Sequence, residues 1–190
     1  MRRSDREVTT PDVMWRMIEE GLVIHLALLD PKDKLYATCV HYGFIREKDI
    51  IYFHGAMKGR KAETLAVHPE AAFQIIGRTE LVPRPGKPGY LLGIYRSVMG
   101  NGRVRVVTTL GEKRLAIRSL HEHYGDAADD YEVSDAILEK VVNVFALEIT
   151  EMTGKIKGYP NPDKPDAKVV LSSSGIRVDK TPCKISVHPV

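Results

Sequence analysis

The residues best suited to chemistry lie where a β-prone run meets a basic turn that contains glycines. Ile50–Phe53 predicts a short strand, and Gly55 and Gly59 free the backbone for the sharp turn that follows. Arg60 and Lys61 then fall in the first turn of a helix, so that side-chain charge and helix dipole act on one anion. The segment predicts a phosphate-binding site, although its spacing is not that of a P-loop. A solvated basic face of a surface helix is the alternative.

A second group of possible ligands lies on the preceding strand. Cys39 and His41 are two residues apart, so they share one face of that strand, and His25 approaches from the neighbouring strand. This arrangement permits a metal site. A small apolar cysteine beside a hydrogen-bonded histidine is the simpler interpretation, and no metal is assigned.

One histidine stands out as a candidate for proton transfer. His54 ends the strand before the basic turn, and an imidazole titrates near neutral pH. His121 and His123 are two apart on a predicted helix, so their side chains diverge, and both are expected at the surface.

Capping signals and hydrophobic periodicity predict the elements that hold these residues. Their predicted order is helix 11–20, strands 22–29, 35–45 and 50–54, helix 60–67, strands 71–77 and 95–107, helices 113–124 and 134–143, and strand 144–149. The first three strands are expected to form an antiparallel meander. Residues 81–90 are rich in proline and glycine, which indicates an irregular loop. The fold class is therefore mainly β with flanking helices, a six-stranded antiparallel barrel.

Composition limits the other possibilities. A chain of 190 residues suits one domain, expected over residues 1–157, followed by an extended or partly disordered arm over 158–190. Two distant cysteines and no secretory leader favour the cytoplasm. Leu22–Leu29, the longest apolar run, is too short to span a membrane. A net charge of +3 permits an anionic ligand, and Arg96, Arg103 and Arg105 lack the interleaved aromatic residues of a nucleic-acid surface.

Three segments taken together resemble the FMN-binding split-barrel superfamily and, within it, the flavoproteins related to nitroimidazole resistance and to pyridoxamine-5′-phosphate oxidase. The segments are Arg3–Glu7, Tyr52–Pro69 and Tyr95–Arg103. The resemblance extends from Arg3 to Lys155. It implies a six-stranded split β-barrel that forms a homodimer, with FMN between the subunits and no nucleic-acid or membrane partner.

The resemblance also implies roles for individual residues. Arg60 and Lys61 would hold the FMN phosphate, and His54 would be the catalytic candidate. The residues assigned to the cofactor are Thr38, Cys39, Val40, His41, Tyr42, Phe53, His54, Gly59, Arg60, Lys61, Arg96 and Ser97. Arg96, Arg103 and Arg105 would then belong to a flavin site or a subunit interface. The implied function is FMN-dependent oxidoreductase chemistry on a small organic substrate such as a nitroaromatic compound.

Two departures argue against activity as a pyridoxamine-phosphate oxidase. Thr38 stands where those enzymes have an additional phosphate-binding arginine, and no tryptophan follows Gly154. Two alternatives stay open. One is a haem-binding protein of the same fold, with His25, His41 or His54 as iron ligand; the other is a flavin store or sensor without catalysis.

Overall fold

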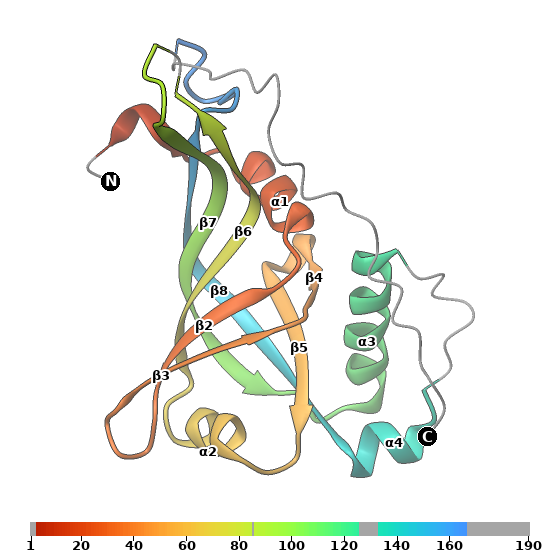
Figure 1. Ribbon diagram of the computed structural model, residues 1–190. Coiled ribbons are helices and arrows are strands. Elements are labelled where there is room, and N and C mark those ends of the chain that lie inside the picture. The colour runs from red at the N-terminus through yellow and green to blue at the C-terminus, as the bar shows by residue number, and fades with distance from the viewer. Residues whose placement is uncertain (1–2, 85, 126–132, 167–190) are drawn as a thin grey trace, which may run out of the picture.

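The computed structural model describes residues 3–84, 86–125 and 133–166. Its elements follow the order η1 (Ser4–Arg6), β1 (Glu7–Val8), α1 (Pro11–Glu20), β2 (Ile24–Leu29), β3 (Leu35–Val40), β4 (Gly43–Ile45), η2 (Arg46–Lys48), β5 (Ile50–Ala56), α2 (Arg60–Val67), β6 (Glu70–Pro83), β7 (Leu91–Val106), α3 (Leu110–Tyr124), α4 (Asp135–Lys140) and β8 (Val142–Lys157), where η marks a 3₁₀-helix. The described part of the chain is therefore mainly β with four α-helices, as predicted (Figure 1).

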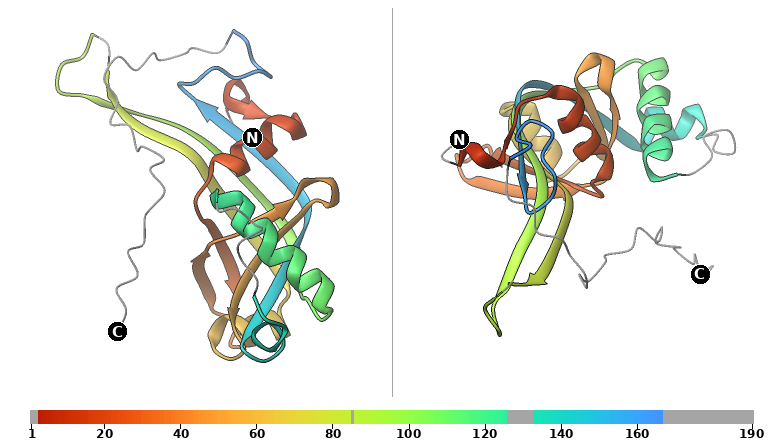
Figure 2. Two further views of the ribbon diagram at one scale, coloured as in Figure 1. Left: turned by 90° about the vertical axis from the view of Figure 1, so that its right-hand side faces the viewer. Right: turned by 90° about the horizontal axis from the view of Figure 1, so that it is seen from above.

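All strands belong to one antiparallel sheet in the order β3-β2-β6-β7-β8-β5-β4, with β1 paired to β8. The two edge strands, β3 and β4, are separated in the chain only by His41 and Tyr42. Because a residue extends the chain by only about 3.5 Å, the two edges of the sheet must lie close together. The sheet is thus curled into a barrel (Figures 1 and 2).

Alternation along the strands builds the core inside this barrel. In β2, Ile24, Leu26 and Leu28 are buried, whereas His25 and Ala27 between them are exposed. α1 contributes Met14, Trp15, Met17 and Ile18 to the same cluster, so it packs against one end of the barrel.

α3 covers part of the barrel's outer surface, beside β4 and β5 (Figure 1). A second apolar cluster lies under it, with Tyr52 from β5, Val144 and Ala146 from β8, and Ala116 from α3. Gly43 permits the close packing, because an added Cβ would collide with the α3 backbone at Ser119 and Leu120. Because Gly43 has no side chain, α3 can pack directly on β4.

The structure corrects the predicted strand pattern. The described residues form eight strands rather than six, because segment 35–45 divides into β3 and β4 at His41–Tyr42 and because β1 was not predicted. The neighbouring segments predicted for the meander do pair antiparallel, β2 with β3 and β4 with β5, but β3 and β4 lie at opposite edges of the sheet, so segment 35–45 is not one continuous strand. The break depends on Tyr42, whose hydroxyl donates to the carbonyl groups of Ile18 and Gly21. Nothing in the local sequence indicates these distant contacts.

Other boundaries also differ from the prediction. β6 extends through Pro83 and β7 begins at Leu91, so residues 81–83 of the predicted loop 81–90 belong to a strand of a long hairpin. α4 ends at Lys140, before the predicted residue 143. β8 continues to Lys157, eight residues beyond the predicted end of the last strand. Cross-strand pairing with β7 stabilises residues whose own sequence gives only a weak strand signal.

The first residues of the predicted arm pack against the rest of the chain. Asp163 accepts hydrogen bonds from the backbone N–H groups of Thr9 and Thr10, at 2.7 and 2.9 Å, and from the Thr10 hydroxyl at 2.7 Å. Asn161 is buried and donates to the carbonyl of Glu7 at 3.1 Å. The weak strand expected at 169–171 and Cys183 lie outside the described residues.

Within the described ranges, no helix combines the length and the apolar character that crossing a bilayer requires.

Candidate functional site

The start of α2 has the conformation that the sequence predicts for an anion site. Gly59 precedes the helix with φ of +116°, a value that favours glycine, and the space beside its Cα is open. No side chain caps the helix among the described residues, and the Glu63 N–H donates to the Gly59 carbonyl at 3.0 Å. The earlier N–H groups of the first turn therefore have no intrahelical acceptor.

Arg60 is held in place by the turn between β2 and β3. Its guanidinium donates to Asp30 at 3.0 Å and lies over the ring of Tyr36, 4.3 Å from the centroid. The Lys34 and Lys32 backbone N–H groups and Arg60 lower the pKa of Asp30. Since the Arg60 side chain is 54% exposed and uses one of its five N–H donors on Asp30, it is pre-oriented while most of its surface faces solvent.

Lys61 supplies a second cation from the same turn. Its Nζ donates to the carbonyl oxygen of His54 at 3.2 Å and lies 5.5 Å from the centroid of the Phe53 ring. Burial lowers the pKa of Lys61. Gly55 leaves room for the lysine here, because an added Cβ would lie 2.8 Å from the Nζ. The lysine thus links α2 to the end of β5.

His54 lies on β5 opposite Val144 of β8, and its side chain remains exposed. The pKa of His54 is nevertheless lowered. The main cause is that nearby protein shields the ring from part of the surrounding water, and the positive charges of Lys61, His41 and His121 add to the effect. An imidazole with a lowered pKa is neutral at physiological pH. His54 can therefore accept a proton or a hydrogen bond there.

The strand expected to support a flavin ring is divided between two environments. Cys39 and His41 are exposed, whereas Thr38 and Val40 are half-buried. Tyr42 is completely buried, and its hydroxyl donates at 2.5 Å to Ile18 and at 3.2 Å to Gly21. Its side chain therefore belongs to the core.

Arg96 and Ser97 are not brought to the α2 end of the sheet. Arg96 pairs with Glu20 of α1 at 2.8 Å and lies over Tyr159 at 4.9 Å, while Ser97 is buried beside Ile76. The partner of Arg96 on β6 is Arg78, eight residues beyond Glu70, where β6 begins. At 3.3 Å per residue this separation is about 26 Å, so a single chain does not gather Arg60 and Arg96 at one phosphate.

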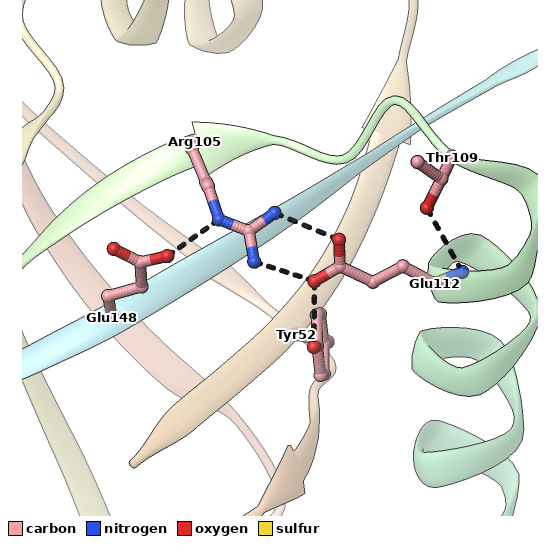
Figure 3. A network of polar contacts seen from close by, with 5 residues as sticks. All are labelled: Tyr52, Arg105, Thr109, Glu112 and Glu148. Atoms are coloured by element: carbon pink, nitrogen blue, oxygen red, sulfur yellow. Dashed lines mark hydrogen bonds and ion pairs between the residues drawn. The ribbon is translucent and has the colours of Figure 1, made fainter. Parts of the chain in front are cut away.

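The remaining arginines of β7 have internal partners. Arg103 pairs with Glu70. Arg105 forms two hydrogen bonds with Glu112, at 2.6 and 3.0 Å, and one with Glu148 at 2.6 Å (Figure 3). Tyr52 donates to the same Glu112 carboxylate at 3.0 Å, and burial with this contact raises the Tyr52 pKa to about 12. These contacts join α3 to β5, β7 and β8 and are structural.

Histidine, cysteine and carboxylate side chains do not form a metal centre in the described ranges. No group of three comes close enough to hold an ion. His123, expected at the surface, is instead half-buried, with its Nε2 2.9 Å from the Gly21 carbonyl.

Residues 10–156 match the family model described as pyridoxamine 5′-phosphate oxidase. The chain belongs to this family. The match contains the α2 turn and both ends of the sheet, so the predicted superfamily is confirmed for most of the chain. No curated protein matches the chain.

Several solved structures have a fold similar to that of this chain. A candidate 5-nitroimidazole antibiotic resistance protein from Bacteroides thetaiotaomicron is 21% identical, with a TM-score of 0.68 over 79% of this chain and 86% of that one. A flavocytochrome from Azotobacter vinelandii is 19% identical, with a TM-score of 0.67 over 83% and 72%. An FAD- and haem-binding protein from Mycobacterium smegmatis is 15% identical, with a TM-score of 0.68 over 80% and 73%. The predicted split-barrel fold is confirmed.

Two residues of this site were missed by sequence reasoning. Asp30 and Tyr36, which hold Arg60, come from the turn and strand before it. From the sequence Asp30 is recognisable only as a turn residue. Its buried carboxylate can be identified as the partner of Arg60 only when the pairing of β2 with β3 beside α2 is known.

Proposed function

We propose that the protein binds FMN, with its phosphate at the start of α2, and acts as an oxidoreductase on a small organic substrate. The observation that carries this proposal is the placement of Arg60 and Lys61 in the first turn of a helix without a side-chain cap. Phosphate oxygens accept hydrogen bonds from guanidinium, ammonium and first-turn N–H groups, so this set of donors fits the group.

The signs of the charges support an anionic ligand there. Cations in the first turn of a helix oppose its dipole, and each such contact costs about 0.3–1 kcal/mol. Asp30 balances one of the two charges. A dianionic phosphate would reverse the remaining unfavourable interaction, which explains why two adjacent cations are placed where carboxylates are normally preferred.

We propose a homodimer as the functional unit. Alternate residues on the outer face of β2, β3 and β6 are exposed, including His25, Ala27, Cys39 and Gln74, and in the described part of the chain no helix covers them (Figures 1 and 2). A second copy would cover this face. It would also supply Arg96 or Ser97 near the flavin bound by Arg60, which their separation within one chain prevents.

The chain's own residues define what the site does. FMN, when bound, supplies the electron-transfer chemistry. Arg60 and Lys61 fix its phosphate, β3 offers a surface for its ring, and neutral His54 holds or accepts a proton beside the substrate. A nitroaromatic substrate follows from the family resemblance and is supported by the fold shared with the Bacteroides protein.

The experiment is an absorbance spectrum of purified protein, before and after FMN is added and excess is removed by gel filtration. We expect one retained FMN per subunit and the elution volume of a dimer. Reduction of a nitroaromatic acceptor with a nicotinamide donor then distinguishes an enzyme from a flavin store. A Soret band with no retained flavin would overturn the proposal in favour of haem, for which exposed His25, His41 and His54 are the candidate ligands.

A further inference from the structure

The side chain of Asp30 divides its two oxygens between its own turn and α2. Oδ1 accepts hydrogen bonds from the backbone N–H groups of Lys32 and Lys34, both at 2.9 Å. Oδ2 accepts from the Arg60 guanidinium at 3.0 Å. Asp30 directly follows β2 and is only 7% exposed. The turn therefore fixes the carboxylate in place independently of Arg60.

Tyr36 supports the same guanidinium from β3. It lies opposite Leu28 of β2 and packs against the hydrophobic core. The Arg60 Cζ lies 4.3 Å from the centroid of the Tyr36 ring. A hydrogen bond and a ring contact, both from outside α2, thus define where the guanidinium lies. In the described part of the chain it has no other acceptor, so its remaining donors are available to a ligand.

The neighbouring cation is held differently. The Lys61 Nζ donates to the His54 carbonyl at 3.2 Å, and within the described ranges no carboxylate pairs with it. Asp30 therefore acts on one of the two cations in the first turn of α2. This difference makes Lys61 an internal comparison for any effect of Asp30.

A carboxylate beside an anion site has two opposite effects. Its charge repels the anion, which between exposed groups in water changes affinity only a few-fold and is screened by salt. It also orients the cation, and a long side chain that becomes fixed only on binding reduces affinity by up to about tenfold. The repulsion is weakened here, because three N–H donors already bind the Asp30 carboxylate. The orienting effect is therefore expected to dominate.

We propose that Asp30, together with Tyr36, is a positioning residue that orients Arg60 toward the phosphate of the cofactor. The turn between β2 and β3 is then part of the phosphate site. This inference deepens the proposed function and rests on it. Its consequence is opposite in sign to that of charge alone, because removal of a negative charge should weaken the binding of an anion.

The test is a fluorescence titration of flavin-free Asp30→Asn with FMN, in dilute buffer and in about 0.5 M NaCl, where charges more than a few ångströms apart are screened. The asparagine oxygen can still accept from the Lys32 and Lys34 N–H groups, while an amide nitrogen replaces the atom that binds Arg60. We expect about tenfold weaker binding than wild type at the higher salt concentration. If Asp30 acted through charge alone, the variant would bind FMN more tightly in dilute buffer and equally well in salt.

Double variants show whether Asp30 acts through Arg60. In an Arg60→Ala background, Asp30→Asn should no longer weaken FMN binding, whereas in a Lys61→Ala background it should weaken binding as much as in the wild type. Asp33→Asn is the matched control on the same turn. Asp33 is 82% exposed and lies 3.8 Å from His68, so this variant should bind FMN as the wild type does.

Tyr36 gives a second test that does not depend on a stable Asp30 variant. Tyr36→Leu removes the ring beside Arg60 and should weaken FMN binding several-fold at both salt concentrations. Tyr36→Phe should restore most of that affinity, because the ring itself contacts the guanidinium. Urea unfolding of each flavin-free variant measures any loss of stability separately.

Two results would overturn the positioning role while the proposed function stands. One is FMN binding by Asp30→Asn that equals or exceeds that of the wild type at the higher salt concentration. The other is a weakening that persists in the Arg60→Ala background, since Asp30 would then act on the fold rather than through Arg60. If the wild type itself binds no FMN, the proposed function fails and this inference fails with it.

Discussion

α2 and α3 begin in opposite ways. α3 starts after Thr109, whose hydroxyl accepts a hydrogen bond from the Glu112 N–H at 3.4 Å, and its first turn carries the acidic Glu112. Arg105 and Tyr52 both donate hydrogen bonds to that carboxylate (Figure 3). α2 starts after Gly59, has no side-chain cap, and carries Arg60 and Lys61 in its first turn.

The difference distinguishes a structural helix start from one that suits a ligand. At α3 the negative side chain complements the dipole, and the polar contacts are completed inside the chain. At α2 two cations add to the positive end of the dipole, and the carboxylates of Asp30 and of Glu63 in the same first turn balance them in part. Arg105 and Arg60 are therefore unlike residues, because Arg105 lies between two carboxylates while Arg60 keeps donors for an anion.

The largest effect is expected from removing both cations of α2. Arg60→Ala with Lys61→Ala should weaken FMN binding by at least about a hundredfold, since two charge-assisted contacts of about 1.5–3 kcal/mol each are lost. The unfolding midpoint of the FMN-free protein should change little, because the deleted charges oppose the helix dipole. Fluorescence titration with FMN and urea unfolding measure the two quantities.

Arg118→Ala is the matched control for charge, because Arg118 is an exposed arginine of α3 paired with Glu122. It should bind FMN as the wild type does. If the double variant kept stoichiometric FMN, the start of α2 would not be the phosphate site, and the contrast with α3 would have no bearing on function.

The local parts of this comparison were predictable from sequence. Thr109 and Glu112 have the spacing of a capping box, and Gly59 before Arg60 marks the other helix start, because both signals lie within a few residues. The Thr109 hydroxyl does cap the Glu112 N–H, whereas the Glu112 carboxylate binds Arg105 and Tyr52. The break at His41–Tyr42 was not predictable, since it depends on hydrogen bonds from Tyr42 to Ile18 and Gly21. Contacts with residues distant in sequence therefore divide a segment that is β-prone throughout.

The roles of the β7 arginines could not be predicted from the sequence either. Arg96 and Arg105 lie nine residues apart on β7, and the sequence offers both to a flavin or an interface. Their carboxylate partners, Glu20 for Arg96 and Glu112 with Glu148 for Arg105, come from other elements. Pairing at this range follows from the sheet order, which periodicity along a single strand does not determine.

The second-largest effect is expected at the start of α3, whose polar contacts are structural. Arg105→Ala should destabilise the protein by about 1–2 kcal/mol, because Glu112 and Glu148 lose their shared cation; partial exposure keeps this below the 3–5 kcal/mol of a fully buried pair. FMN binding should be unaffected. Arg103→Ala, on the same strand with an exposed partner, should cost less than about 1 kcal/mol. Equal losses in urea unfolding would contradict the structural role of Arg105.

The smallest effect concerns a third helix start. Thr9 and Thr10, just before α1, are held by Asp163, whose pKa is lowered to about 2 by the Thr10 hydroxyl and then the Thr10 and Thr9 N–H groups. Asp163→Asn should therefore cost about 1 kcal/mol at neutral pH, and Asp166→Asn, on the same segment, should cost nothing measurable.

The pH dependence of this cost tests its origin. The lowered pKa means that the ionised Asp163 stabilises the fold fully above the unfolded-state pKa of about 4 and loses this contribution as pH falls towards 2. Urea unfolding of both proteins should show a constant difference above about pH 5 that shrinks in more acidic solution. A difference independent of pH would mean that shape, rather than charge, ties the segment after β8 to α1. The start of α1 would then depend on packing, and α2 would remain the helix start whose charge is left for a ligand.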